Sequence, residues 1–226
     1  MHDDRAVVER RIERELWQRI LPHVYRERRP FTLEAWHVPG EPVPYDHAVA
    51  QTFEPFALGG AWGPPWGTTW FRLSGDVPAD WVGPQLEAVV DLGWGMRGPG
   101  FQAEGLVWWD GAPLQGVHPR RTAVPLPQVG AGPVSFLIEA AANPAMPASF
   151  RPSPLGSLDT AGSSPLYRVA MADLAVRDDE VYHLCLDIEV LVGVMKGLPL
   201  DDPRRQRVLR QLQRAFDAID VRDVSG

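Results

Sequence analysis

The sequence predicts a mainly β protein: an antiparallel β-sandwich of jelly-roll type with an N-terminal helix and a C-terminal helical hairpin. Short runs of alternating apolar residues between positions 68 and 176 are separated by Gly, Pro and Asn turn signals. No helical repeat interrupts those runs, which favours a sandwich over an alternating α/β fold. Apolar residues recur at helical spacing only before residue 22 and after residue 178. We therefore divide the chain into an N-terminal amphipathic helix (1–29), a β-sandwich domain (30–177) and a helical hairpin or linker (178–226).

The first element is an amphipathic helix over residues 5–21, which Pro22 ends or kinks. Its apolar stripe repeats every four residues and consists of Val8, Ile12, Leu16 and Ile20. Residues 30–67 are rich in Pro and Gly and have no clear periodicity, so we expect an extended segment wrapped over the core. The prolines of its WGPPWG stretch restrict the backbone, and we expect Trp62 and Trp66 to be packed.

Strands occupy the middle of the chain. Alternating apolar positions indicate strands over 68–77, 86–92, 135–141 and 166–176, and the Pro, Ser and Gly of 145–165 indicate a surface loop. Between them, Glu104–Trp109 and Ala112–Val117 flank Asp110-Gly111, a dipeptide that favours the type I′ turn of a β-hairpin. Trp108 and Trp109 are adjacent in this hairpin and should point to opposite faces. We expect one of them in a core and the other on a surface, a neighbouring domain or a ligand.

The C-terminal fifth of the chain has a helical period. Asp178 or Asp179 can cap a first helix that ends at Gly197, and Asp202-Pro203 has the sequence of an N-cap followed by the first residue of a second helix. The apolar faces consist of Val181, Leu184, Cys185, Ile188, Leu191, Val192 and Met195 on the first helix, and of Val208, Leu209, Leu212, Phe216 and Ile219 on the second. We expect this seam to pack on the sandwich, on the first helix of the chain or on a missing domain.

Composition and charge exclude several classes of function. The net charge of -7 and the pI of about 5.4 argue against a nucleic-acid partner. Cys185 is the only cysteine, so an intrachain disulfide is impossible. The charged N-terminus lacks the apolar segment of a signal peptide, and no stretch approaches the length of a transmembrane helix. We expect a cytoplasmic protein without a membrane partner.

Most candidate chemical motifs have a simpler explanation. The G-x-G-x-x-G pattern that begins at Gly93 is followed by Pro99 and a strand, where a dinucleotide site needs a helix. No metal site is predicted, because the His2–Asp4 pair lies at the extreme terminus and the other histidines lack ligand spacing. The carboxylates that could serve in glycoside hydrolysis are Asp91, Glu104, Asp110 and Glu139. Their positions indicate no catalytic pair, so no catalytic residue is predicted.

The tryptophans are the candidate carbohydrate-binding residues. Aromatic faces stack on sugar rings, and Trp94 lies in a glycine-rich loop beside the Trp108/Trp109 hairpin. We therefore take Trp94 with Trp108 or Trp109 as a sugar-contacting pair. The alternative is that these side chains serve the core or an interdomain surface, because tryptophan is highly buried on average.

Three ordered motifs resemble a known family. They are WGPPWGTTWFR (Trp62–Arg72), GFQAEGLVWWDGAPLQGVHPRR (Gly100–Arg121) and EAAANP (Glu139–Pro144). Together they resemble the N-terminal region of glycoside hydrolase family 38 α-mannosidases, in the bacterial form of the cytosolic or vacuolar subgroup, over essentially the whole chain. The resemblance implies a galactose-binding-like sandwich that precedes a catalytic domain. Enzymes of this family are zinc-dependent and retaining, and none of their catalytic or zinc-binding residues can be placed on this chain.

The resemblance implies that this chain alone is inactive and binds no cofactor, with zinc held by the catalytic domain of the full-length enzyme. Its role would be to dock on its own catalytic domain, to mediate contacts in a homo-oligomer and to shape the sugar site, while the full enzyme binds mannosides or oligosaccharides. Two alternatives stay open. One is an autonomous carbohydrate-binding, lectin-like module, and the other is a structural remnant of a split gene.

Overall fold

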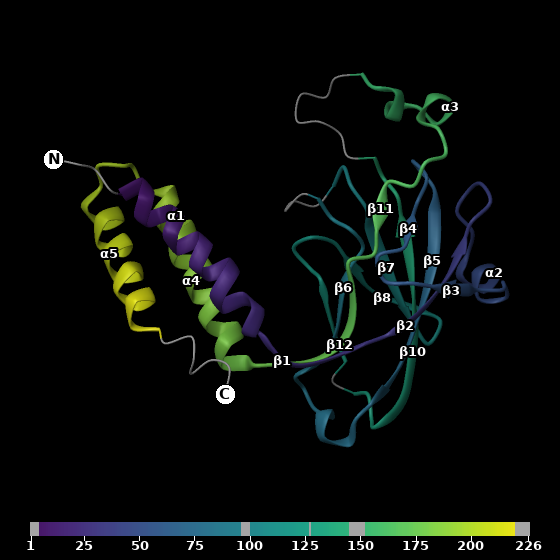
Figure 1. The fold of residues 1–226 in the computed structure, drawn as a ribbon, viewed down its shortest axis with the longest axis horizontal. Coiled ribbons are helices and arrows are strands. Elements are labelled where there is room, and N and C mark those ends of the chain that lie inside the picture. Colours follow the sequence, from purple (N-terminus) through teal and green to yellow (C-terminus); the bar gives the residue numbers. More distant parts are fainter. Residues whose placement is uncertain (1–4, 96–99, 127, 145–151, 220–226) are drawn as a thin grey trace. The chain divides into compact units, whose positions relative to one another are not determined.

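The computed structural model describes residues 5–95, 100–126, 128–144 and 152–219. The described chain forms two compact units, shown as ribbons in Figure 1. Arg28–Ala175 make up the jelly-roll unit, and Met1–Glu27 together with Val176–Gly226 make up the helical unit. The helical unit has an apolar core of its own.

The described part of the jelly-roll unit contains two large sheets and one small sheet, which confirms the predicted mainly β sandwich. The six-stranded sheet has the order β3-β2-β5-β10-β7-β8, with β2 (Thr32–His37), β3 (Glu54–Phe56), β5 (Thr68–Val77), β7 (Glu104–Trp109), β8 (Ala112–Val117) and β10 (Gly132–Ala141). The four-stranded sheet has the order β1-β12-β6-β9, with β1 (Tyr25–Pro30), β6 (Leu86–Asp91), β9 (Ala123–Pro125) and β12 (Met171–Arg177). The small sheet pairs β4 (Ala61–Trp62) with β11 (Tyr167–Arg168). The connections contain α2 (Tyr45–Val49), η3 (Ala79–Trp81), η4 (Pro154–Gly156) and α3 (Leu158–Ala161).

One face of the six-stranded sheet forms the interior of the sandwich. Ile138 of β10 lies opposite Phe71 of β5, and both side chains are buried. A Cβ atom built on Gly105 of β7 would lie 2.8 Å from Ile138 and 3.1 Å from Leu92, which follows β6 of the other sheet. The face that carries Ile138 and Phe71 therefore meets the four-stranded sheet. The alternate residues, including Trp70, point to the opposite face.

The central hairpin forms as predicted. β7 pairs with β8, and the turn residues Asp110 and Gly111 have φ values of +47° and +80°. Positive φ at both positions is the requirement of a type I′ turn, and it explains the Asp-Gly sequence. The pairing shifts between Val107 and Trp108, which marks a bulge or irregularity in the ladder.

Residues 30–67 are more regular than the sequence pattern indicated. They contribute three strands, and β2 pairs with β5 from Thr32 opposite Ser74 to His37 opposite Thr69. Trp62 is buried as expected, and its indole Nε1 donates a hydrogen bond to the carbonyl oxygen of Leu92 at 2.9 Å. The expectation that Trp66 is packed is wrong, because its side chain is 43% exposed.

The last predicted strand of the sandwich is divided. Residues 166–176 form β11 and then β12, which belong to different sheets. The backbone of Val169 and Ala170 between them bonds to Gly60 and to Asp91, respectively. The sequence pattern did not indicate this change of partner. The predicted loop at 145–165 contains η4 and α3, and its residues 145–151 lie outside the described part.

The described part of the helical unit is built from helices at both ends of the sequence. α1 (Arg5–Glu15) continues as a π-helix (Leu16–Ile20) and a 3₁₀ turn (Leu21–His23), which confirms the first predicted helix. α4 (Asp179–Gly197) and α5 (Pro203–Ala218) form the predicted hairpin. The Asp178 carboxylate accepts hydrogen bonds from two backbone N–H groups at 3.0 Å each, and Asp202 accepts one from Arg204 at 2.7 Å. Both predicted caps are therefore confirmed.

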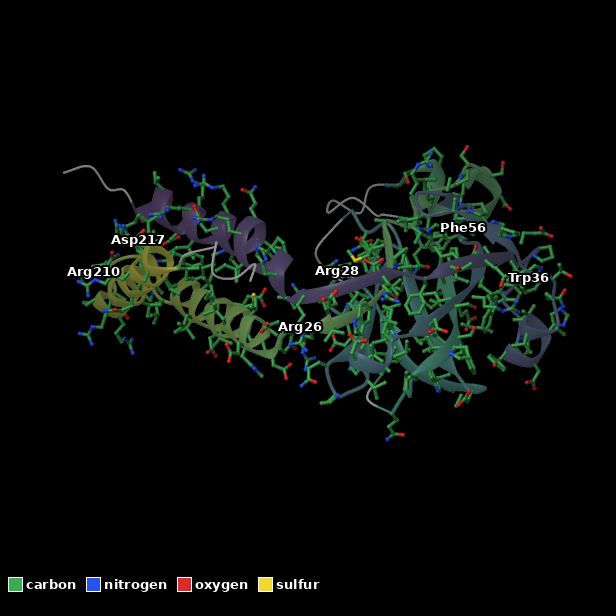
Figure 2. All side chains as sticks on the ribbon, turned by 60° about the horizontal axis from the view of Figure 1, so that its bottom comes forward. Arg26, Arg28, Trp36, Phe56, Arg210 and Asp217 are labelled. Atoms are coloured by element: carbon green, nitrogen blue, oxygen red, sulfur yellow. The ribbon has the colours of Figure 1, made fainter. Side chains whose placement is uncertain are left out.

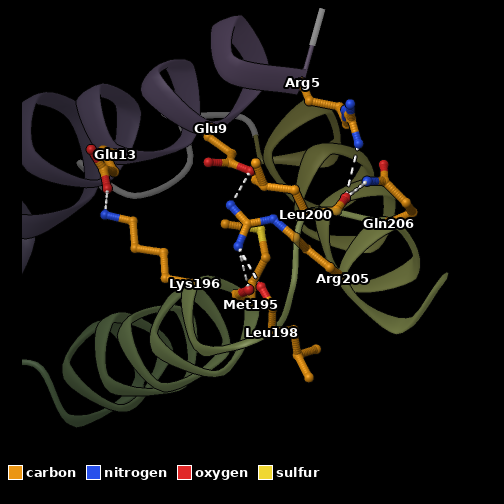
Figure 3. Close-up of polar contacts among 9 residues, drawn as sticks. All are labelled: Arg5, Glu9, Glu13, Met195, Lys196, Leu198, Leu200, Arg205 and Gln206. Atoms are coloured by element: carbon orange, nitrogen blue, oxygen red, sulfur yellow. Dashed lines mark hydrogen bonds and ion pairs between the residues drawn. The ribbon is translucent and has the colours of Figure 1, made fainter. Parts of the chain in front are cut away.

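The apolar seam of the hairpin is covered by the first helix, one of the three arrangements expected. The core consists of Ile12, Leu16, Ile20, Val24, Cys185, Ile188, Met195, Leu209, Leu212 and Phe216. A buried arginine joins its elements (Figure 3). Arg205 donates to the Glu9 carboxylate at 2.8 Å, and to the carbonyl oxygens of Met195 at 2.8 Å and Leu198 at 3.1 Å. Among the described residues we find no helix whose length and apolar content would let it cross a bilayer.

Candidate functional site

The outward face of the six-stranded sheet carries a cluster of aromatic side chains. We call Trp36, Tyr45, Trp70 and Trp108 the aromatic face. Trp36 and Trp70 are cross-strand partners in β2 and β5, and Trp108 lies beside Leu137 of β10. Trp70 packs with Ala48 and Phe53, which places α2 and the residues after it over this part of the sheet. Strand alternation brings the three tryptophan rings to one side, because each lies at the parity opposite to Phe71 and Ile138. Tyr45 reaches the same side from α2.

The rings of the aromatic face contact one another closely. Tyr45 stacks on Trp108 with 5.0 Å between ring centroids and an interplanar angle of 26°. Trp70 lies 5.9 Å from Trp108 and 6.2 Å from Tyr45. Trp70 is fully buried, whereas the other three rings are half-buried. Because Tyr45 covers one face of the Trp108 ring, much of the aromatic surface is already in contact with other side chains of the chain.

Polar groups border the aromatic face. The indole Nε1 of Trp108 donates to the Glu139 carboxylate at 3.2 Å. Arg72 pairs with Glu34 at 3.3 Å, and its guanidinium lies 4.0 Å from the centroid of the Phe53 ring. The buried Nε1 of Trp70 has no hydrogen-bond partner among the described residues. Aromatic rings beside a carboxylate and a guanidinium offer the types of group that contact sugar hydroxyls and ring faces.

The structure does not bring the three predicted sugar-contacting tryptophans together. Trp94 follows β6, and its indole Nε1 donates to the carbonyl oxygen of Ala103 at 2.7 Å, next to the start of β7. Trp108 and Trp109 lie at the far end of that strand and point to opposite faces, as the hairpin predicted. Trp109 stacks on Phe136 at 5.7 Å on the side opposite to Tyr45. All three rings are half-buried, so neither hairpin tryptophan is fully in the core. Sugar contact by these residues stays a prediction.

Sequence reasoning missed three members of the aromatic face, Trp36, Tyr45 and Trp70. Trp70 lies in the predicted strand over 68–77, at the parity opposite to Phe71. Trp36 lies in Thr32–His37, where the alternation of Leu33 and Ala35 with polar or aromatic neighbours is the signal of a strand. Tyr45 opens the short helix α2 and meets Trp108 only through the fold, since 63 positions separate them in the sequence. No local pattern could have indicated that contact.

Three of the four candidate carboxylates accept hydrogen bonds, and that of Glu139 comes from the indole of Trp108. Asp91 accepts from the backbone N–H groups of Gly93 at 2.8 Å and Trp94 at 3.1 Å. Glu104 accepts from the backbone N–H of Gly100 at 2.8 Å, while Asp110 occupies the hairpin turn. Each therefore has a structural role in a loop or turn. Glu104 of β7 and Glu139 of β10 lie at the same parity of these paired strands, with Glu139 opposite Leu106.

The described residues do not fit a zinc site. They contain no group of three or more His, Cys, Asp or Glu side chains that could hold a metal ion. His2 and Asp4 lie outside the described part of the chain. Burial lowers the pKa of His37, and its Nδ1 lies 2.9 Å from Thr69 Oγ1, so this histidine belongs to a hydrogen bond within the sheet.

A shallow apolar groove lies at one edge of the jelly-roll unit. It has a volume of about 380 Å³ and is lined by Pro30, Phe31, Leu33, Phe56, Leu58 and Ala172, among others. Figure 2 labels Phe56, which lines this groove, and Trp36, which belongs to the aromatic face. The groove offers apolar contact but lacks the convergent polar groups that orient a small polar substrate.

Comparison with known proteins identifies relatives over most of the chain. Residues 29–175 match the family described as the jelly roll domain of α-mannosidases. The chain is 33% identical to α-mannosidase 2C1 of Homo sapiens over 190 residues, which is 81% of this chain and 17% of that protein. It is also 33% identical to α-mannosidase 2C1 of Mus musculus, over 85% of this chain and 17% of that protein. Identity to α-mannosidase G of Dictyostelium discoideum is 22%, over 81% of this chain and 16% of that protein. The chain thus spans about a sixth of the length of these relatives.

Proposed function

The chain belongs to the α-mannosidase jelly-roll family, and on that premise we propose that it is the non-catalytic N-terminal module of a zinc-dependent, retaining α-mannosidase of glycoside hydrolase family 38. The observation that carries this proposal is the match over residues 29–175 to a domain that makes up a small part of its relatives. In the proposal, zinc and the catalytic carboxylates belong to the remainder of the enzyme, which acts on terminal α-mannosyl residues in the cytoplasm. The described residues contain no group of three or more His, Cys, Asp or Glu side chains that could hold a metal ion.

The role of the module is to dock on the catalytic domain, to contribute contacts within a homo-oligomer and to shape the rim of the sugar site. The packing of the aromatic face supports a scaffold role. Tyr45 covers Trp108, and Trp70 is buried beneath them, so the rings hold α2 against the sheet. The Trp109–Phe136 stack likewise ties β7 to β10.

Turnover of an aryl α-mannoside tests whether this chain is non-catalytic and the remainder of the enzyme carries the activity. The 226-residue chain should release no aryl alcohol with or without added zinc, because the proposal assigns the catalytic carboxylates to the remainder of the enzyme. The intact polypeptide purified from its source cells should hydrolyse the same substrate, and a chelator should abolish that activity. Zinc-dependent turnover by the 226-residue chain itself would refute the proposal.

A carbohydrate-binding, lectin-like module is the second candidate function. It is favoured by the half-buried Trp36, Tyr45 and Trp108 beside Glu139 and Arg72. Titration of the chain with mannosides, followed by tryptophan fluorescence, tests it. Saturable binding that Trp108→Ala removes and Trp66→Ala retains would support this role, because Trp66 is exposed and its indole donates to the carbonyl oxygen of Leu155, not to a residue of the aromatic face. The variants Trp94→Ala and Trp109→Ala test the other two predicted residues in the same assay.

A further inference from the structure

α4 carries an apolar stripe on its outer side. The stripe, which we call the α4 stripe, consists of Leu184, Leu186, Val190, Leu191 and Val194. These side chains are 38–64% exposed, whereas Cys185, Ile188 and Met195 on the same helix are buried in the core of the helical unit. α4 therefore exposes apolar side chains to water, next to charged ones such as Asp187 and Glu189, in addition to those that it buries in the core.

Helix geometry places most of the stripe in one row. Leu186, Val190 and Val194 are four residues apart and form this row, and Leu191 lies one turn before Val194 at its side. Leu184 lies nearer the buried side of the helix, and the exposed Asp187 lies between it and the row. Val190 follows the buried Ile188 by two positions, about 200° around the helix, so this row faces away from the core. Contiguous apolar side chains on a protein surface mark a site of contact with another protein surface or with a membrane. Since α4 does not qualify as a membrane span, a protein surface is the occupant to expect.

Gly193 lies along the same side of α4. A Cβ atom built on it would meet nothing within 4 Å, so packing within the described chain does not require glycine there. Glycine weakens an exposed helix relative to alanine. Its position, three residues after Val190, leaves room for another backbone to approach α4 closely.

We propose that the α4 stripe is the docking surface for the part of the α-mannosidase polypeptide outside the region shared with this chain. The inference rests on the proposed function and names the surface that docking would use. In the relatives at 33% identity the matched region is 17% of the protein, so most of each polypeptide is other sequence. A tethered partner has an effective concentration in the millimolar range. A covalently linked partner will therefore outcompete a separate molecule for an exposed apolar helix face.

The size of the stripe favours a tethered partner over a second copy of the chain. Stable interfaces between separate proteins use about 20–30 residues from each side. The α4 stripe offers five apolar side chains, and the outer face of α5 is lined by exposed arginines such as Arg207 and Arg210. A covalent connection removes the need for a full-sized interface, because the partner is already held nearby.

Photo-crosslinking in the intact polypeptide tests the proposal. A photoreactive phenylalanine analogue replaces Val190 in the polypeptide produced from its own gene, and crosslinked peptides are identified by mass spectrometry. We expect crosslinks to peptides of the same polypeptide outside residues 1–226. A second probe at Val194 should give the same partner peptides. The matched control replaces Arg210 on the outer face of α5 (Figure 2) and should give none of them.

Crosslinks from positions 190 and 194 to a second copy of this chain, or no protein crosslink at either, would overturn the docking surface. The same preparation separates this outcome from failure of the proposed function. A polypeptide of only 25.1 kDa would refute both the proposed function and the docking inference that rests on it. A larger polypeptide that hydrolyses α-mannosides without these crosslinks would refute the docking surface alone.

Discussion

α4 and α5 pack on the same core, but their outer faces differ. Both begin at an aspartate cap, and both bury an apolar row against α1. The outer face of α5 carries Arg204, Arg207, Arg210 and Arg214, all exposed, whereas that of α4 carries the α4 stripe. A helix with one apolar face needs no further partner in water. This contrast is the reason for proposing that α4, and not α5, contacts additional protein.

The largest loss of stability should come from substitution of Arg205, the buried arginine on the inner side of α5. Arg205→Ala leaves the Glu9 carboxylate and two carbonyl oxygens without their donor, so the free energy of unfolding of the helical unit should fall by about 4 kcal/mol. Urea unfolding followed by circular dichroism at 222 nm measures this. Arg207→Ala on the exposed face is the control and should change stability by less than about 0.5 kcal/mol. Equal effects of the two variants would contradict this role for Arg205.

Alanine substitutions compare the inner seam directly with the α4 stripe. Leu212→Ala removes a buried side chain and should cost about 3 kcal/mol. Val190→Ala removes an exposed one and should change the stability of the chain by less than about 0.5 kcal/mol, because alanine is also the better helix former. The same unfolding assay applies. A large loss from Val190→Ala would mean that the chain itself covers the stripe.

The single cysteine reports on the buried side of α4. Burial, with a smaller contribution from the Glu189 charge, raises the pKa of the Cys185 thiol to about 11. Because the thiolate is the reactive form, alkylation by iodoacetamide at pH 8 should be more than about 100-fold slower than that of a thiol with a pKa of about 8.5. The control is Val190→Cys in a Cys185→Ala background, which should react at the rate of an ordinary exposed thiol. Similar rates at the two positions would contradict the assigned faces of α4.

Removal of the α4 cap should have a moderate effect. Asp178→Ala deletes the acceptor for two backbone N–H groups and should cost about 1 kcal/mol. Asp187→Ala, in the exposed middle of the same helix, should be neutral or slightly stabilising. Hydrogen exchange of the first turn of α4 separates the two, since only loss of the cap should accelerate it.

A pH-dependent contribution in the jelly-roll unit should be the smallest effect. Burial raises the pKa of Asp173, and the charge of Arg28 opposes this in part. A carboxyl whose pKa is higher in the folded state binds its proton more readily there, so its contribution to stability falls as pH rises through the interval from the unfolded to the folded pKa. Asp173→Asn should remove that part of the pH dependence of unfolding of the jelly-roll unit, as measured by tryptophan fluorescence. If the pH dependence of unfolding is the same with and without Asp173→Asn, this contribution of Asp173 is contradicted.

The features that local sequence could predict are those with local causes. Asp110-Gly111 fixes the hairpin turn, and Asp178 and Asp202 cap their helices, because each acts within a few residues of itself. The strand β2 was missed because its alternation of Leu33 and Ala35 is short and lies in a Pro- and Gly-rich segment. Trp66 was expected to be packed because its neighbours are rigid, yet rigidity of a backbone does not decide where its side chain points.

The two sides of α4 and the aromatic face are features that sequence patterns could not predict in full. Leu184 and Leu191 were assigned to the buried seam, but the structure exposes them. α4 has apolar residues on more than one side, so periodicity alone could not indicate which side meets the core. The opposite orientations of Trp108 and Trp109 followed from strand parity, whereas the contact of Trp108 with Tyr45 depends on the tertiary fold.

The size of the native polypeptide tests the central claim most directly. An antibody raised against this chain is used to blot an extract of the source cells. We expect a band several times larger than 25.1 kDa, because the chain matches 17% of its relatives and its α4 stripe is proposed to meet the remainder. A band at 25.1 kDa would contradict the account, and glycan binding would then become the leading candidate function.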